Sequence, residues 1–280
     1  MTTVSTAAFG AQGRSAAGLG RPEVLVTLPV RDEAPRLVDT LRALSAALDA
    51  AGFRYRLSVA EDGSTDGTKE LLARLPTEFP GILIQQHERS LGRGKALRLL
   101  WAQVDADIYC FTDTDLATGP NAVVDAIRHV LDGEEIVVGS RYAPGAEVHR
   151  PPLRELVSKV YNALLRLTFR ERIRDHQCGL KVFSAESIRR LLPASREDSW
   201  FWDTEILVLA LQANVPVLEM PVYWVERKTR RTRLGRLFSD IYLHGTGLVR
   251  LRSRIQIPRG ELPPVRRAGP TPDASLNSRF

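Results

Sequence analysis

Short apolar runs alternate with amphipathic stretches over the first half of the chain. The run VLVTLPV at 24–30 is apolar and β-branched, which is typical of a strand buried on both faces of a sheet. After it, leucines recur at the spacing of one helix face until Gly52 ends the pattern: Leu37, Leu41, Leu44 and Leu48. The pattern predicts a β-strand followed by an α-helix.

The same unit repeats along the chain. Further strands are expected at 54–60, 81–86, 108–111 and 135–140, and helices at 64–75, 95–104 and 121–132. Strands that alternate with helices predict an α/β fold whose central sheet is mostly parallel and covered by helices on both faces. Because ligands of such sheets bind beyond the carboxyl ends of the strands, polar residues that directly follow a strand are the candidates for a site.

Composition adds the limits of the folded region. The 280 residues, 44% hydrophobic and 26% charged, are enough for one large globular domain, expected at 21–240. Residues 1–20 are rich in small residues and 258–280 in Pro and Arg, so both are predicted to be disordered. Cys110 and Cys178 do not form a CxxC pair and are expected to be reduced core thiols. With neither a secretory signal nor a membrane-spanning stretch in the pattern, a cytoplasmic location is expected.

Two aspartates follow the strand expected at 108–111. Since alternate residues of an extended segment point the same way, Asp113 and Asp115 should both face the edge of the sheet while Thr114 points elsewhere. Two carboxylates this close repel each other unless a cation lies between them, and oxygen ligands suit Mg²⁺ or Mn²⁺. Both are therefore candidate metal ligands. The alternative is an Asp turn or cap before the next helix.

Two other loops could meet a nucleotide. The loop EDGSTDGT at 61–68 could hydrogen-bond a base or ribose. Arg89, Arg93 and Lys95 lie at a predicted helix start, where charge and helix dipole favour phosphate oxygens. The sequence GRGK in this region is not a P-loop, because the first glycine of GxxxxGK would fall at Arg89 and Ala96 replaces Ser or Thr.

Taken in order, seven segments resemble inverting family 2 glycosyltransferases with the GT-A fold, over about residues 24–240: LPVRDEAPRL, EDGSTDGT, LGRGKAL, DTDLA, VGSRY, DHQCGLKVF and FWDTEIL. The last two, followed by VPVLEMPVYW, are most similar to the polyprenyl-phosphate branch, first dolichyl-phosphate glucosyltransferases and then dolichol-phosphate mannose synthases.

The resemblance implies a role for individual residues. Contacts with the nucleotide base would come from Pro29, Arg31, Glu33 and Asp62. Asp113 and Asp115 would hold Mg²⁺ or Mn²⁺ against the diphosphate of a nucleotide sugar, UDP-glucose or GDP-mannose. The acceptor phosphate would be met by Arg141, with Arg150 or Arg154.

The chain departs from the family pattern at two places. Mannose synthases typically read DADLQHP where this chain reads DTDLATG, so Ala117 supplies no side-chain ligand and the third protein ligand is open. Arg31-Asp32 stands where Tyr-Asn is common, which leaves base recognition open as well.

The acceptor decides which catalytic groups are needed. A phosphomonoester has a second pKa near 6, so it is mostly anionic at neutral pH and attacks without a strong base. The metal would neutralise the leaving diphosphate and arginines would position the acceptor. A sugar hydroxyl would need a base, for which Asp203 and Glu205 are candidates; their alternative role is a buried pair that caps an apolar helix.

The C-terminal part bears on the location of the protein. Between 225 and 255, nine Arg or Lys residues against two acids alternate with apolar residues, which suits an anionic membrane surface, with a possible amphipathic segment at 241–257. The alternative is a solvated basic tail packed through Leu237 and Ile241.

The leading hypothesis is a hexosyltransferase that moves glucose or mannose from a nucleotide sugar to a polyprenyl (dolichyl) phosphate, peripheral on the cytoplasmic face of the membrane. A family 2 enzyme with a soluble phosphorylated or sugar acceptor is the second reading. A basic nucleic-acid-binding module is the non-enzyme alternative, but the sequence contains no recognised nucleic-acid motif, so no nucleic-acid partner is expected. A nucleotidyltransferase would carry a Gly-rich loop after its first strand, which LPVRDEAPRL lacks.

Overall fold

A computed structural model describes residues 3–5, 21–225, 245–255 and 265–269 of the protein. The predicted disordered tails, 1–20 and 258–280, lie outside the described residues except for two short strands, β1 (Thr3–Ser5) and β11 (Val265–Arg267). Of the possible membrane-surface segment at 241–257, residues 245–255 are described.

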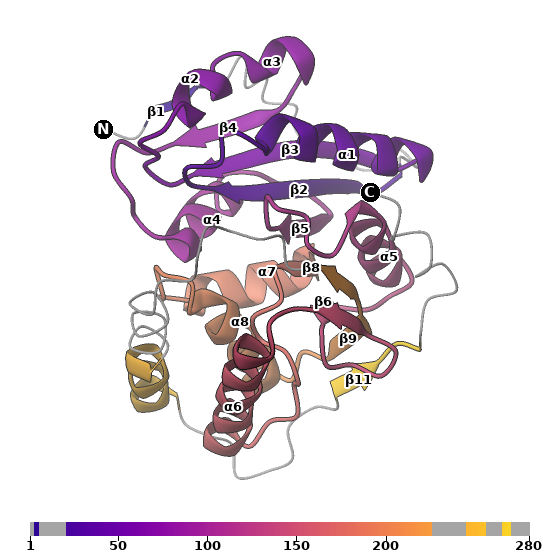
Figure 1. Ribbon diagram of the computed structural model, residues 1–280, viewed down its shortest axis with the longest axis vertical. Helices are drawn as coiled ribbons and strands as arrows, with labels where there is room; N and C mark the ends of the chain where they lie inside the picture. The colour runs from indigo at the N-terminus through magenta and orange to yellow at the C-terminus, as the bar shows by residue number, and fades with distance from the viewer. Residues whose placement is uncertain (1–2, 6–20, 226–244, 256–264, 270–280) are drawn as a thin grey trace.

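A nine-stranded sheet runs through the described part of the chain (Figure 1). Its strand order is β1-β4-β3-β2-β5-β8-β6-β9-β11. The strands not yet given are β2 (Glu23–Val30), β3 (Arg54–Glu61), β4 (Leu83–Gln86), β5 (Ile108–Thr112), β6 (Ile136–Ser140), β8 (Leu180–Ser184) and β9 (Val217–Pro221). Neighbouring strands are parallel, apart from β1 at one edge and β8, which is antiparallel to both β5 and β6. The predicted mostly parallel sheet is confirmed.

Helices cover both faces of this sheet, as predicted. They are α1 (Leu37–Ala50), α2 (Thr68–Leu72), α3 (Leu75–Glu78), α4 (Arg93–Trp101), α5 (Pro120–Leu131), α6 (Pro152–Phe169), α7 (Ala185–Leu191) and α8 (Trp202–Gln212). A small two-stranded sheet, β7 (Glu147–His149) with β10 (Tyr223–Val225), lies apart from the large one. In the described residues, none of the helices combines the length and apolar character that crossing a bilayer requires.

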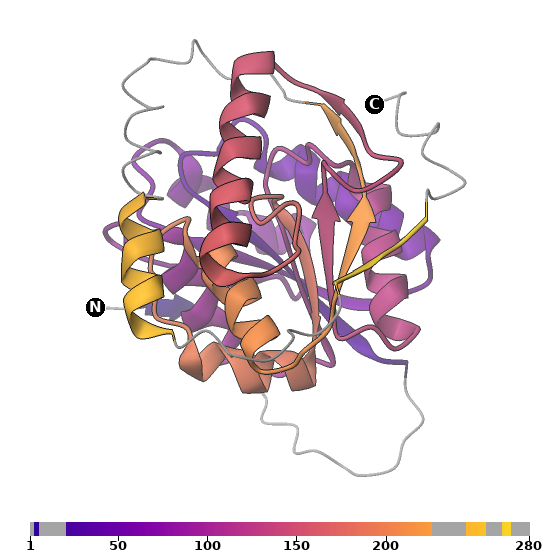
Figure 2. The same ribbon diagram turned by 90° about the horizontal axis from the view of Figure 1, so that it is seen from below.

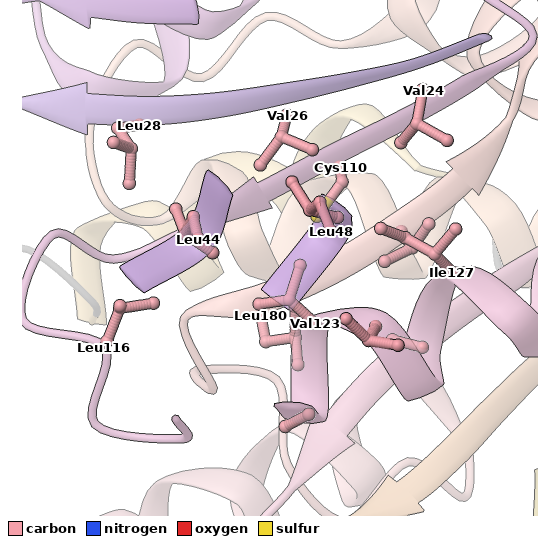
Figure 3. Close-up of a cluster of buried hydrophobic side chains, with 14 of the residues drawn as sticks. Val24, Val26, Leu28, Leu44, Leu48, Cys110, Leu116, Val123, Ile127 and Leu180 are labelled. Carbon is pink, nitrogen blue, oxygen red and sulfur yellow. The ribbon is translucent and has the colours of Figure 1, made fainter. Parts of the chain in front are cut away.

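The alternation of side chains along β2 divides the core into two layers. Val24, Val26 and Leu28 point to one face, where they pack with α1 and α5 (Figure 3). Leu25 points to the other face and packs with α4, α7 and α8. Because β2 is apolar at both sets of positions, it is buried on both faces, as the continuous apolar run predicts.

The order of the strands fixes where a ligand can bind. From β2 the chain moves outward through β3 and β4, and then returns to the opposite side of β2 to form β5. The carboxyl ends of β3, β2 and β5 therefore lie side by side, and Val30 is in register with Glu61. This reversal of direction opens the crevice in which parallel α/β sheets bind their ligands.

Candidate active site

The two aspartates after β5 face the crevice. Asp113 and Asp115 are both partly exposed, whereas Thr114 between them is buried, and its hydroxyl donates a hydrogen bond to the carbonyl of Pro29 (3.3 Å). Asp115 accepts one hydrogen bond from the backbone N–H of Ala117 (3.1 Å), so it also shapes the turn. The following helix, α5, has no side-chain cap. The alternation therefore follows the predicted pattern. Of the two alternatives, the Asp turn is present at Asp115, whereas a cap of α5 by either aspartate is not.

Asp113 belongs to a chain of charges that runs into the core. The guanidinium of Arg93 lies 2.9 Å from Asp113 and 3.0 Å from Asp203, and Asp203 is 3.7 Å from the ammonium of Lys181. Arg93 also lies over the rings of Phe111 (4.9 Å) and of the exposed Trp200 (4.3 Å). Two acids thus alternate with two cations, and this network links the candidate metal ligand to α4 and α8.

The charge of Asp113 is finely balanced. The pKa of Asp113 is raised to about 6, mainly by burial; the Arg93 guanidinium opposes this shift and the Asp115 carboxylate adds to it. A cation that binds beside Asp113 would stabilise its charged form and lower this pKa. A raised pKa of this kind is consistent with a pair of acids that binds a metal ion.

Gly179 makes room for Asp113. The backbone N–H of Asp113 donates to the carbonyl of Gly179 (3.0 Å), and a Cβ atom on Gly179 would lie 1.9 Å from a carboxylate oxygen of Asp113. Gly179 reaches this place because β8 is antiparallel, so its amino end lies at the same edge as the carboxyl end of β5. Sequence reasoning quoted Gly179 within DHQCGLKVF without assigning it a role; a glycine directly before an apolar strand is the signal that could have indicated a close backbone approach.

Arg141 follows β6 at the same edge and is held by Asp175. Its Nε and Nη2 donate to the two carboxylate oxygens of Asp175 (2.7 and 2.8 Å), and its backbone N–H donates to the same group (3.0 Å). The guanidinium also lies over the ring of Trp224 (4.9 Å). Asp175, which the sequence analysis missed, therefore holds the Nε and Nη2 groups of the Arg141 guanidinium. The Nη1 group of Arg141 is turned away from Asp175.

Arg150 lies close to Arg141. Burial, and then the nearby charge of Arg141, lower the pKa of Arg150, and its Nη1 donates to the hydroxyl of Ser158 (3.3 Å). Arg154 is partly exposed in the first turn of α6. The structure thus brings two of the three expected acceptor arginines together, and the third is at the start of the next helix.

Asp62 organises the loop that follows β4. Its buried carboxylate accepts hydrogen bonds from the backbone N–H groups of Leu91 (2.6 Å) and Gly92 (2.9 Å) and from the hydroxyl of Ser90 (2.8 Å). Arg31 donates to the same hydroxyl (3.0 Å). A Cβ atom on Gly63 would lie 2.2 Å from the backbone nitrogen of Ser90, so the Asp-Gly pair is required for this loop to approach β3.

Glu33 completes the wall of the crevice. Burial raises the pKa of Glu33, the Asp115 and Asp113 charges add to this effect, and Arg36 at 3.0 Å opposes it. Pro29, the residue before the last of β2, is partly exposed. The residues expected around the nucleotide, from β2, β3 and β5, therefore share one edge of the sheet.

The glycines of GRGK serve packing. A Cβ atom on Gly92 would lie 2.3 Å from the carbonyl oxygen of Asp198, and one on Gly94 would lie 2.4 Å from Cβ of Trp202. The neighbouring Lys95 is partly exposed and lies 4.0 Å from Asp198, and Arg89 is exposed in the preceding loop. The glycine spacing is thus explained by the close approach of the segment before α8.

The two acids of α8 have different surroundings. Asp203 is buried in the Arg93 network, next to Asp113. Glu205 is 1% exposed, accepts from the backbone N–H groups of residues 196 and 197 (2.9 and 2.7 Å), and forms an ion pair with Arg254. For Glu205 the geometry favours the structural alternative.

Residues 245–255 pack against α6 and α8. Leu251 and Ile255 join a small apolar cluster with residues of both helices, and Arg250 lies 3.0 Å from Glu197. Leu237 and Ile241, through which a solvated tail would pack, lie outside the described residues. The described part of the basic stretch is therefore anchored to the domain.

The donor set fits a metal ion that arrives with its substrate. Across the described ranges there is no group of three or more His, Cys, Asp or Glu side chains that could hold an ion alone, and Ala117 offers no ligand. Two carboxylates with substrate phosphates are nevertheless the usual way in which Mg²⁺ is held. Asp113 and Asp115 fit this arrangement.

A mostly parallel α/β sheet with the antiparallel β8 between β5 and β6, and acids at the end of the central β5, is the architecture of the GT-A glycosyltransferase fold. The model of the family "Glycosyl transferase family 2" matches residues 25–192, and the chain belongs to this family.

Two curated relatives are named as glycosyltransferases. Glycosyltransferase AglD from Haloferax volcanii is 36% identical over 231 residues, which are 81% of this chain and 36% of that protein. Dolichyl-phosphate beta-glucosyltransferase ALG5C from Trichomonas vaginalis is 29% identical over 71% of this chain and 63% of its own length. The chain thus spans less than two thirds of both proteins.

A solved structure shares the fold. Glucosyl-3-phosphoglycerate synthase from Mycobacterium tuberculosis, in complex with Mn²⁺, UDP-glucose and glycerol 3-phosphate, superposes with a TM-score of 0.63 at 20% identity. The alignment covers 89% of this chain and 88% of that structure.

Proposed function

We propose that the protein transfers a hexose from a nucleoside diphosphate sugar to a polyprenyl phosphate of the dolichyl type. The observation that carries the proposal is the shared edge of the sheet, where Asp113 and Asp115 follow β5 and the Arg141–Arg150 pair follows β6. Acids for a metal-bound diphosphate and arginines for a second phosphate thus lie at the same edge of the sheet, with β8 between their two strands. Relatives named dolichyl-phosphate beta-glucosyltransferase support this acceptor.

The donor would bind over β2, β3 and β5. Pro29, Arg31, Glu33 and the loop held by Asp62 would surround the nucleoside, with Arg89 and Lys95 near its phosphates. Asp113 and Asp115 would hold Mg²⁺ or Mn²⁺, which when bound neutralises charge on the leaving diphosphate. Solved structures of the M. tuberculosis synthase with Mn²⁺ and UDP-glucose support a divalent ion and a uridine nucleotide.

The state of the candidate bases favours a phosphate acceptor. Asp203 is ion-paired with Arg93 and Lys181, and Glu205 with Arg254, so both carboxylates already have cationic partners within the protein. A phosphomonoester needs no such base, since it is already mostly anionic at neutral pH. Arg141, positioned by Asp175, and Arg150, with Arg154 at the start of α6, would hold that phosphate in line with the sugar C1.

A polyprenyl phosphate places the reaction at a membrane surface. The net charge of +6 suits an anionic surface, and we propose a peripheral position on the cytoplasmic face. The sugar, glucose or mannose, and the nucleotide, UDP or GDP, are left to the experiment below.

A soluble phosphorylated acceptor is the second candidate. The M. tuberculosis synthase has been solved with phosphoglyceric acid and with glycerol 3-phosphate, both of which carry a phosphate that paired arginines could hold. A hydroxyl nucleophile would, however, need a base. Asp203 could act only after release from Arg93, which disfavours this reading.

The test is a panel of UDP- and GDP-sugars, each incubated with polyprenyl phosphate or with 3-phosphoglycerate. We expect a glycolipid with one donor, activity lost in EDTA and restored by Mn²⁺ or Mg²⁺, and no activity of Asp115→Ala. Transfer to 3-phosphoglycerate alone would select the soluble acceptor. Full turnover in chelator would exclude the metal role of Asp113 and Asp115.

A further inference from the structure

Helix α6 presents its apolar side chains to solvent. The side chains that face the core are spaced three or four residues apart: Ser158, Asn162, Leu165 and Phe169. The opposite side, which we call the outer face of α6, carries larger apolar residues with exposed fractions from 49% to 77%: Leu153, Leu156, Val160, Leu164 and Leu167. Helix α6 lies at the lower end of the molecule in Figure 1, and in Figure 2, seen from below, it lies in front, beside the helical residues 245–254.

This polarity is the reverse of that of an ordinary surface helix. Two of the four inward positions are polar, while the outward positions form a continuous apolar stripe over four turns. A contiguous apolar stripe, unlike single exposed leucines, marks an interaction surface. The stripe therefore needs an apolar partner.

A basic pocket adjoins the helix. It has a volume of about 460 Å³ and is lined by five cationic side chains, among other residues: Lys159, Arg166, Arg172, Arg174 and Arg267. Lys159 also pairs with Glu155 (2.5 Å), and Arg267 lies 3.9 Å from Glu219. Burial raises the pKa of the one acid in the lining, Glu171, to about 8, so at neutral pH this carboxyl does not cancel the positive charge.

The pocket and the stripe share one helix. Lys159 and Arg166 belong to α6 and directly precede Val160 and Leu167 of the outer face. An apolar surface bordered by cations matches a bilayer with anionic lipids, whose phosphates lie just above the acyl chains. A protein partner would have to present apolar and acidic groups in the same order.

We propose that the outer face of α6 enters the surface of an anionic bilayer while the basic pocket binds the phosphate of a lipid head group. The proposal rests on the proposed function for its purpose: Tyr142 lines the pocket and Arg141 precedes it, so the bilayer would lie beside the arginines that take the acceptor phosphate. It moves the main membrane contact from the basic stretch at 225–255 to α6.

The test measures binding of the full chain to vesicles of phosphatidylcholine with about one third phosphatidylglycerol. Leu156→Asp with Leu164→Asp should weaken binding at least about tenfold, because two charges would have to enter the apolar layer. Arg166→Gln with Arg172→Gln should weaken it about 30-fold, at about 1 kcal/mol for each charge, with no effect on pure phosphatidylcholine.

The matched control is Leu131→Asp with Arg128→Gln on α5, an exposed leucine and arginine of another helix. The control should bind like the wild type. Unchanged binding by both α6 variants would overturn the proposal and assign membrane contact to other residues. So would a wild-type dimer that becomes monomeric in the leucine variant while vesicle binding is kept, because the occupant would then be a second copy.

Inorganic phosphate distinguishes a lipid from a free anion. If millimolar phosphate protects the wild type, but not the arginine variant, against thermal unfolding and does not compete with vesicles, the pocket binds free phosphate and the lipid assignment fails. Competition between phosphate and vesicles supports the shared pocket. Both α6 variants should retain transfer to a short, water-soluble prenyl phosphate; absence of transfer by the wild type itself would contradict the proposed function and leave the vesicle result standing.

Discussion

The backbone of Gly179 lies against the carboxylate of Asp113, the candidate metal ligand. Its Cα faces the Asp113 carboxylate, and a methyl group would have to occupy the place of an oxygen. Gly179→Ala should therefore displace Asp113 and weaken Mn²⁺ binding at least tenfold, with a similar loss of transfer. Calorimetric titration with Mn²⁺ in the presence of nucleoside diphosphate measures the effect.

The control for this substitution is Gly67→Ala. A Cβ atom on Gly67 meets nothing within 4 Å, and its φ of −70° suits alanine, so Mn²⁺ affinity should not change. Equal affinities of Gly179→Ala and wild type would mean that Asp113 does not hold the ion in the position seen here.

Glu171 is a buried acid that folding keeps protonated. Its pKa rises from 4.5 to about 8 through burial, so its contribution to stability is complete below pH 4.5 and disappears as pH rises through 8. Glu171→Gln should raise Tm at pH 8 but change it little at pH 4.5. One pKa unit corresponds to about 1.4 kcal/mol, and each kcal/mol to about 2–4 °C in a domain of this size.

Comparison of variant and wild type at each pH removes contributions from distant groups, whereas the buried His176, whose Nε2 lies 3.7 Å from Glu171, responds together with it. Burial lowers the pKa of His176 from 6.5 to about 3. Considered by itself, this shift makes the fold more stable as pH rises from about 3 to 6.5. The exposed Glu186→Gln serves as the control and should show no such pH-dependent gain. A Tm difference between Glu171→Gln and wild type that is the same at pH 5 and pH 8 would contradict the assignment.

At this scale, sequence patterns predict which residues lie at the edge of the sheet but not what they contact. Period-two alternation was enough to direct Asp113 and Asp115 to the crevice. Asp113 contacts Arg93 and Gly179, and Arg141 contacts Asp175. These partners come from distant parts of the chain, and only the packing of β8 and α8 brings them together. Pairings of this kind leave no periodic signal in the sequence.

At the scale of elements, the buried Arg93 of α4 bridges Asp113, directly after β5, and Asp203 of α8. Arg93→Met would leave Asp113 and Asp203 without the guanidinium between them, and we expect a loss of about 3–5 kcal/mol in the free energy of unfolding, since buried charges would become uncompensated. Adding Asp203→Asn should recover part of this loss, because it removes one of those charges. Urea unfolding measures all three proteins.

Arg98 on the same helix provides the comparison. It pairs with Asp198, whose side chain is 50% exposed, so Arg98→Met should cost only about 1 kcal/mol. If Arg93→Met costs no more than Arg98→Met, the buried network does not join these elements.

The regular βα units could be predicted because each strand and helix carries its own period. The antiparallel β8 could not be placed in the sheet by the same means, since its apolar run LKVF does not reveal strand direction. Helix α6 also misleads pattern analysis, because its apolar side is the exposed one.

At the scale of the whole molecule, donor binding should stabilise the fold through mass action. At about 100 times Kd, a ligand adds about 2.7 kcal/mol, or several degrees in Tm. We expect a larger shift with nucleoside diphosphate and Mn²⁺ together than with either alone, and the enhancement by Mn²⁺ should disappear in Asp115→Ala. Thermal unfolding with UDP or GDP would also identify the base.

A shift of equal size for UDP and GDP, unaffected by Mn²⁺, would indicate non-specific anion binding. The basic composition makes this control necessary, because a protein with a net charge of +6 attracts polyanions in general. Inorganic pyrophosphate supplies the matching anion without a base.

The segment from Asp175 to Gly179 touches both halves of the proposed reaction. Asp175 fixes Arg141 and Gly179 abuts Asp113, and four residue steps can span at most about 14 Å. The separation between leaving group and nucleophile is thus limited by covalent chain length as well as by packing. For enzyme engineering, this divides the molecule into parts that can be exchanged and parts that must be kept. New acceptors could be sought by exchanging α6 and its neighbouring loop. An insertion of even one residue between 175 and 179 would misalign both substrates.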